Sequence, residues 1–295
     1  MTSKLRKSLF YIPIIALALA SLLPTAAHAH RQWLLPSAST VEGREPWVTI
    51  DAGVSENLFD VDTAALKLDG LTITGPDGTA VAPDNILNGH QRNSIELKLS
   101  KPGTYKIALA SESVMASYTL DGEQKRFRGS IEDFAKEIPA NAQDVKKSIT
   151  YSRNETFVTT GQPNDAALKP TKIGLEMIPL TPPTELHAGQ KTGFRFLIDG
   201  KPAAKLGFSL VPGGVRYRGV LNEIRLVTND KGEASLTWPA AGMYWVTASW
   251  PERVPGMEDQ GPGTGQNESK GESKGQTAQP ARRLSYSATL EVLPQ

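Results

Sequence analysis

Short stretches in which apolar and polar residues alternate recur along the chain, each bounded by Gly, Pro, Asn or Asp. Alternation of this kind puts the apolar side chains on one face of a β-strand. Helix signals are nearly absent, and the one expected helix runs from a capping residue, Ser130, to Glu137. The pattern therefore predicts an all-β chain of the sandwich type. The clearest expected strands are 47–52, 71–74, 94–99, 104–109, 192–198, 206–211, 223–228, 234–238 and 284–293.

Two segments of the chain resemble each other. Residues 101–109 and 240–248 each place a Gly, one further residue, a Tyr and then an alternating strand. In a sandwich this is the signature of a late strand whose tyrosine is anchored at a corner. We therefore expect two related Ig-like β-sandwich modules, 30–180 and 181–295, with the boundary near Leu180-Thr181-Pro182-Pro183.

The stretch 251–283 consists mostly of Gly, Gln, Ser, Lys, Glu and Pro. Such a composition cannot bury enough apolar area to offset the entropy lost on ordering. We expect a disordered loop here that joins two strands of the second module.

The first 29 residues have the layout of a secretory signal peptide. Lys4, Arg6 and Lys7 precede an apolar stretch, and a small-residue region ends in Ala27-His28-Ala29, which fits the A-x-A cleavage rule. The apolar stretch is short for a membrane span and contains a proline. We expect export to the periplasm, removal of residues 1–29 and no membrane span after cleavage.

Charge and cysteine content exclude several function classes. Of the 32 lysines and arginines, three lie in residues 1–29, which leaves 29 against 31 acidic residues and a mature net charge of −2. This balance does not favour nucleic acid or an anionic membrane surface as a partner. Because the chain has no cysteine, its stability comes from packed apolar surface and its chemistry uses no thiol.

The candidate metal ligands start with the histidines at the cleavage site. If cleavage follows Ala29, His30 carries a free α-amine and an imidazole, which together can chelate one Cu(II) or Ni(II) ion. If cleavage follows Ala27, the mature chain starts His28-Ala29-His30, and a histidine in third position gives a square-planar site for the same metals. The alternative is that histidines near a cleavage site are accidental and frayed.

Other ligands are less specific. His90 and His187 each lie in a turn before a strand and are candidates for a third nitrogen, although a solvated loop histidine is the default. Asp60 and Asp62 would share one face of an extended segment, yet aspartates in strand connections are common. Of the tryptophans, Trp47 and Trp245 are expected in the core by alternation, and Trp33 follows His30 closely enough to wall off a terminal site.

No catalytic pattern is evident. The sequence has no Gly-x-Ser-x-Gly elbow, no phosphate-binding glycine loop and no paired-histidine zinc helix. We therefore expect a protein that is not an enzyme; an oxidative copper centre at His30 is the enzymatic alternative.

The motifs of the chain resemble those of a known family. The start His30-Arg31-Gln32-Trp33-Leu34-Leu35-Pro36, the turn Gly75-Pro76-Asp77-Gly78 and the two tyrosine-bearing segments are similar to exported bacterial proteins catalogued as domain of unknown function 4198. Members are often labelled a periplasmic component of nickel or cobalt uptake. The second half also resembles the Ig-like module of carboxypeptidase-regulatory type.

Two function hypotheses follow from the residues and the resemblance. The first is a soluble periplasmic accessory that captures or delivers Ni, Co or Cu, with a metal transporter or an envelope protein as its partner. The second is a non-metal module that binds envelope polymer or protein through sheet edges.

We expect the exported protein to have lost its first 27 or 29 residues, because both cuts satisfy the A-x-A rule. Mass spectrometry of the chain isolated from the periplasm, tagged at its C-terminus, should identify His28 or His30 as the first residue. A mature chain that retains the basic N-terminal region would contradict cleavage.

Overall fold

The computed structural model describes residues 30–251 and 281–295, so the expected signal peptide, His28 and nearly all of the expected loop 251–283 lie outside the described residues. The described chain is all-β, as expected, and forms three sheets. Sheet A contains β1 (Arg31–Pro36), β2 (Trp47–Ser55), β7 (Arg92–Lys98) and β6 (Asn85–Asn88) in that order, with β3 (Ala64–Ala65) beside β2.

Sheets B and C complete the architecture. Sheet B runs in the order β16 (Ile224–Val227), β15 (Gly207–Pro212), β18 (Gly242–Trp250), β19 (Arg282–Leu293), β10 (Gln143–Thr160), β8 (Gly103–Leu120), β4 (Leu71–Thr74) and β5 (Ala80–Val81). Two more strands pair with it, β12 (Leu186–His187) and β9 (Glu123–Gly129). Sheet C contains β11 (Leu175–Pro179), β13 (Lys191–Ile198), β14 (Lys201–Pro202) and β17 (Glu233–Thr237). The short helices are α2 (Ile131–Glu137), η2 (Ala166–Leu168) and α3 (Val215–Arg218).

Local sequence explains several of these elements. Ser130 caps α2, since its side-chain oxygen accepts a hydrogen bond from the Asp133 N–H at 3.0 Å, which confirms the expected helix. Asp199 and Gly200 both have positive φ, at 51° and 77°, as the tight turn of the β13–β14 hairpin requires.

Both expected tyrosine corners are present. The Tyr105 hydroxyl donates to the Lys101 carbonyl at 2.9 Å and accepts from the Lys101 N–H at the same distance. The Tyr244 hydroxyl donates to the Ala240 carbonyl at 3.0 Å. Each tyrosine thus ties the start of its strand to the turn four residues earlier.

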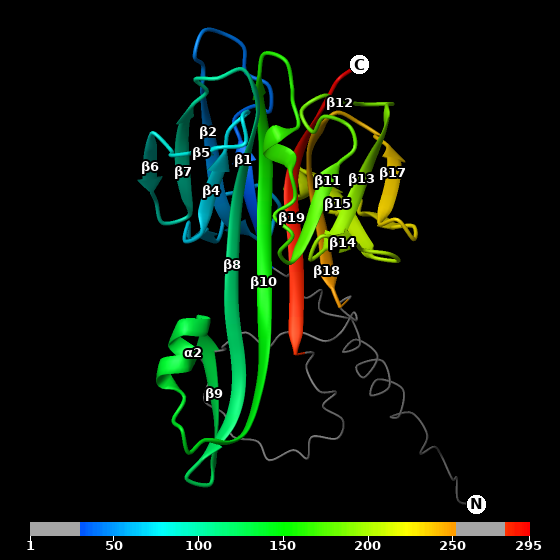
Figure 1. Ribbon diagram of the computed structural model, residues 1–295. Coiled ribbons are helices and arrows are strands. Elements are labelled where there is room, and N and C mark those ends of the chain that lie inside the picture. Colours follow the sequence, from blue (N-terminus) through cyan, green and yellow to red (C-terminus); the bar gives the residue numbers. More distant parts are fainter. Residues whose placement is uncertain (1–29, 252–280) are drawn as a thin grey trace, which may run out of the picture.

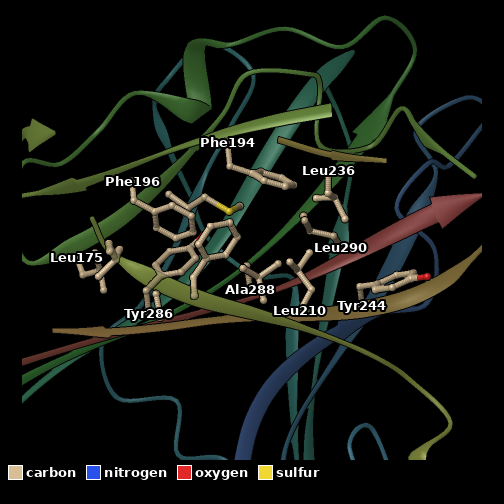
Figure 2. Close-up of a cluster of buried hydrophobic side chains, with 14 of the residues drawn as sticks. Leu175, Phe194, Phe196, Leu210, Leu236, Tyr244, Tyr286, Ala288 and Leu290 are labelled. Atoms are coloured by element: carbon tan, nitrogen blue, oxygen red, sulfur yellow. The ribbon is translucent and has the colours of Figure 1, made fainter. Parts of the chain in front are cut away.

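Two separate apolar cores lie on opposite faces of sheet B. Sheet A packs on one face over β4, β8 and β10, while sheet C packs on the other face over β19, β18 and β15. Consecutive residues of β10 divide between them, because Phe157 lies in the core under sheet C and Val158 in the core under sheet A. Figure 2 shows the core under sheet C, with Phe194 and Phe196 from sheet C near Tyr286 and Leu290 from sheet B.

The two halves of the chain join through a parallel strand pair. β19 is the last strand of the second half, as expected, yet it also pairs with β10 of the first half, from Ile149 opposite Arg282 to Thr156 opposite Thr289. The two sandwiches therefore stand side by side along one continuous sheet (Figure 1). β11, which precedes the expected boundary near Leu180, pairs with β13 and adds Leu175 and Met177 to the core under sheet C.

Charged groups are buried at this joint. Glu155 on β10 accepts a hydrogen bond from the Tyr286 hydroxyl of β19 at 2.8 Å and lies 3.3 Å from Arg153. Burial raises the pKa of Tyr286 well above its usual value, and the nearby Glu155 charge adds to the effect. Glu176 on β11 accepts from Thr171 and Lys172. The joint is therefore held by satisfied polar groups as well as by backbone pairing.

An arm extends away from both sandwiches. It consists of residues 115–148, the part of β8 and β10 beyond the pairing of β10 with β19, together with β9 and α2 (Figure 1). α2 packs on one face of the arm, where the Phe134 ring lies 5.5 Å from that of Phe127 and under the Lys147 ammonium. The sequence does not predict the arm, because its strands continue past the alternating segment 104–109 without a clear apolar pattern.

Neither tryptophan that was expected in the core is a buried core residue. Trp245 is half-buried at the contact between the two halves, on the opposite side of β18 from the core residues Tyr244 and Val246. Trp47 is 55% exposed, so its expected place in the core is wrong. It is the first residue of β2, and the neighbouring Val48 takes the core position instead.

Tyr286→Phe should lower the free energy of unfolding by about 2 kcal/mol, because the buried Glu155 carboxylate loses a hydrogen bond. Tyr244→Phe is the matched control, since it removes a hydrogen bond to a neutral carbonyl and should cost about 1 kcal/mol. Urea denaturation of the three proteins measures both. An equal or smaller loss in Tyr286→Phe would show that the Glu155 contact does not stabilise the joint.

Candidate functional site

His30 lies immediately before β1, and its side chain is 56% exposed. Its Nε2 atom is 3.9 Å from Oε1 of Glu56, which follows the last residue of β2. The two residues meet because β1 and β2 pair antiparallel, with Arg31 opposite Ser55. Sequence reasoning missed Glu56, since only the strand register brings it beside His30.

The start of β1 is held by Trp33. Its indole is buried, donates from Nε1 to the Ser55 hydroxyl at 2.8 Å and meets the Phe59 ring edge to face. A Cβ at Gly53 would come within 2.4 Å of the indole, so the absence of a side chain there makes room for it. Trp245 of β18 also donates to the backbone carbonyl of Gln32 at 3.0 Å. His30 therefore stands three residues before a buried, hydrogen-bonded side chain.

The same anchor joins the two halves of the chain. Trp33 and Leu58 from the first half form a buried cluster with Val211 and Val215 from the second half. The expectation that Trp33 would wall off a terminal site is thus replaced by a packing role, because the ring points into this junction.

The loop after β2 is ordered by Asp62. Its carboxylate accepts hydrogen bonds from the Glu56 N–H at 3.3 Å, the Asn57 N–H at 3.4 Å and the Thr63 hydroxyl at 2.9 Å. Burial opposes ionisation of Asp62, but these hydrogen bonds outweigh it and lower its pKa below that of a free aspartate. Asp62 thereby fixes the backbone of Glu56, the residue next to His30.

Asp60 and Asp62 do not form the shared carboxylate face that an extended segment would give. Residues 60–62 bend, and the two carboxylates have different surroundings. Asp60 lies 3.7 Å from Arg216 of α3, across the junction between the halves, and its buried Oδ2 atom accepts no hydrogen bond.

The remaining histidines are not gathered around His30. His90 is exposed in the turn between β6 and β7, and its carbonyl accepts from the Ala65 N–H at 3.1 Å, which puts it at the same end of sheet A as His30. His187 lies in β12 beside the last residues of β19, with Nδ1 2.8 Å from the Pro294 carbonyl oxygen. Within residues 30–251 and 281–295, no group of three His, Cys, Asp or Glu side chains stands close enough to hold a metal ion.

Arg31 connects His30 to the second half electrostatically. Its guanidinium donates to the Glu56 carbonyl at 2.7 Å. Burial lowers the pKa of Arg31, while the charge of Glu223, which precedes β16, opposes that effect. Glu56 and Arg31 therefore flank His30, and Glu223 of the second half acts on Arg31.

A separate cleft of about 730 Å³ lies between the halves, beside the junction cluster. Its lining is mostly apolar and includes Leu35, Phe59 and Met243. The cation in the lining, Arg218, donates to the backbone carbonyls of Pro212 and Leu221 and also contacts that of Gly213. The cleft thus contains no cluster of candidate metal ligands.

The family described as "Domain of unknown function (DUF4198)" matches residues 27–252. The match confirms the resemblance drawn from the sequence motifs; its description mentions neither nickel nor cobalt. No curated protein matches the chain. No helix in the described part of the chain is long and apolar enough to span a membrane.

Three solved structures are similar to this chain at low sequence identity. The D0-D1 domain of intimin is 14% identical, with 88% of this chain and 97% of that chain covered and a TM-score of 0.21. The D1-D4 ectodomain fragment of ICAM-5 is 11% identical, with 90% and 51% covered and a TM-score of 0.21. The FN1-FN3 domains of chicken CNTN1 are 8% identical, with 75% and 93% covered and a TM-score of 0.18.

Asp62→Asn should loosen the loop that carries Glu56, because an amide accepts hydrogen bonds from N–H groups more weakly than a carboxylate. The pKa of Asp62 is lower in the folded state than in the unfolded state. The ionised Asp62 carboxylate therefore stabilises the fold above about pH 4, and this contribution is lost as the pH falls below that value. Hydrogen exchange of the Glu56 and Asn57 amides should be faster in the variant at neutral pH. At a pH low enough to protonate Asp62 the two proteins should exchange alike; a difference that persists there would rule out the carboxylate as its cause.

Proposed function

We propose that this chain, which belongs to the DUF4198 family, is a periplasmic metal-binding accessory protein whose mature N-terminal His30 binds Cu(II) or Ni(II). The observation that carries the proposal is the carboxylate of Glu56, 3.9 Å from Nε2 of the exposed His30 ring. The proposed role is capture or delivery of the ion, with a metal transporter or envelope protein as the partner.

The chemistry of His30 supports this ligand set. Cleavage after Ala29 frees the α-amine, and the amine and Nδ1 of the same residue can close a chelate ring around one ion. A metal-bound histidine commonly donates its other ring N–H to a carboxylate, which fixes the tautomer and raises the basicity of the ligating nitrogen. Glu56 lies on the Nε2 side and is suited to that task.

The surroundings of His30 favour a site that is formed before the metal arrives. Trp33 and the Trp245–Gln32 hydrogen bond hold β1, and Asp62 holds the backbone of Glu56. A pre-positioned donor pair loses less conformational entropy on binding than two free loop residues. The remaining coordination positions would be filled by solvent or by the partner that receives the ion.

The alternative cut gives a different site for the same metals. With His28 as the first residue, His30 stands in third position, and the amine, two amides and its imidazole form a square-planar set. In that case Glu56 has no ligand-orienting task, so its replacement distinguishes the two sites.

Calorimetry with Cu(II), Ni(II) and Co(II) on the C-terminally tagged mature protein should give one equivalent of Cu(II) or Ni(II). Glu56→Gln should weaken binding by about tenfold or more if His30 is the first residue. His90→Ala is the matched control and should leave affinity unchanged, because the turn that carries His90 precedes β7, which lies two strands of sheet A away from β1.

A second variant tests the terminal amine. A short extension that ends in proline before His30 moves the amine away and should abolish the site. Identical binding with and without the extension would overturn the proposal.

A further inference from the structure

One face of sheet B outside the apolar cores is rich in hydroxyl groups. In β19, Leu284, Tyr286 and Ala288 point into the core under sheet C, so Ser285 and Ser287 point to the opposite side. The same alternation brings serines and threonines of four neighbouring strands to that side. We call this set the hydroxyl face: Ser111, Ser113, Ser117, Thr150, Ser152, Ser285, Ser287, Thr247, Ser249 and Ser209.

The strand register arranges these side chains in rows. One row runs across β8, β10, β19 and β18 and consists of serines, because Ser152 pairs with Ser111 and Ser285, and Ser285 pairs with Ser249. Ser285 donates to the Ser152 hydroxyl at 2.9 Å. Neighbours within a row stand about 4.8 Å apart and successive rows about 6.8 Å apart. The face thus offers a regular grid of donors and acceptors.

A buried amide continues the grid beneath β1. Asn154 lies in the next row, opposite Ser287, and is 3% exposed. Neither its oxygen nor its nitrogen has a hydrogen-bond partner among the described side chains and backbone, and the same holds for the hydroxyl of Thr289. A buried amide without partners is costly. Asn154 lies on the same side of β10 as Ser152, at the end of the hydroxyl face that β1 covers. Its unpaired amide therefore indicates that a polar ligand group enters this end of the face.

The other end of the face is basic. Arg126 of β9 and Lys146 of β10 stand on either side of Ser117 in one row, and Arg128 stands in the following row beside Met115. All three cations are exposed and have no ion-pair partner among the residues that the structure describes. On β8 and β9 the carboxylates Glu112 and Glu123 alternate to the opposite side of the sheet, and so does Glu155 on β10.

We propose that the hydroxyl face binds an anionic glycan. The cations at its far end pair with carboxylate or phosphate groups, the serine rows exchange hydrogen bonds with sugar hydroxyls, and Asn154 receives a polar group at the covered end. From the row of Ser117 to the row of Asn154 the grid is about 27 Å long, which suits several linked sugars rather than one. Among the grid positions there is no aromatic ring for sugar stacking, so recognition rests on hydrogen bonds and charge.

The test uses the full mature chain and an oligogalacturonate as probe, with a chelator present so that the proposed metal site does not contribute. Calorimetry should detect binding that weakens as salt increases. Arg126→Gln, Arg128→Gln and Lys146→Gln together should lower the affinity by at least about tenfold. The matched control, Lys125→Gln, Lys136→Gln and Lys147→Gln, removes the same charge from the opposite face and from α2, and should change affinity less than about twofold.

A second pair of variants tests the hydroxyl rows at constant charge. Ser152→Val with Ser285→Val should weaken oligogalacturonate binding, while circular dichroism remains that of the parent. Polyglutamate and a neutral dextran serve as competitors. The proposal would be overturned if oligogalacturonate did not bind, or if the two charge triples lost equal affinity for it. It would also be overturned if polyglutamate bound equally well and its affinity were unchanged by the serine substitutions. That last result would identify an acidic protein as the partner.

Discussion

The parallel pairing of β10 with β19 is the interaction on which the rest of the structure depends. It makes one sheet serve two sandwiches, with sheet A on one face and sheet C on the other. Successive residues of β10 therefore enter different cores, as Phe157 and Val158 do. Glu155 and Tyr286 are buried at the same joint, so a slip of one residue would turn charged groups into the wrong core.

The shared sheet also determines where the candidate sites lie. Sheet A covers only part of the face of sheet B on which it packs. β1 lies over β10 and β19, at the border between the covered and the uncovered part of that face. Trp33 and Trp245 fix that border by contacts across the two halves. His30 lies at the exposed start of β1, and the hydroxyl face continues from beneath β1 onto the arm. The two proposed sites are thus neighbours that use different chemistry.

Local patterns predicted much of the fold and little of the sites. The helix after Ser130, the Asp199-Gly200 turn and both tyrosine corners follow from residues close in sequence. The prediction that Trp47 lies in the core was wrong because the first residue of a strand can fit the apolar alternation and still be exposed. The arm was missed because β9 and α2 stabilise strands whose own pattern is weak. Glu56 and the serine rows were missed because their significance depends on the register of distant strands.

By itself the sequence determined the all-β class, the positions of most strands and turns, and the place of a histidine next to a signal-like segment. These features depend on period-two alternation, turn residues and short motifs, which act within a few residues. The tertiary structure alone decided which face of each strand is covered, which carboxylate stands beside His30 and which hydroxyls share a row. Alternation marks two faces of a strand without saying what covers each, and pairing between residues more than a hundred positions apart is set by packing of the whole chain.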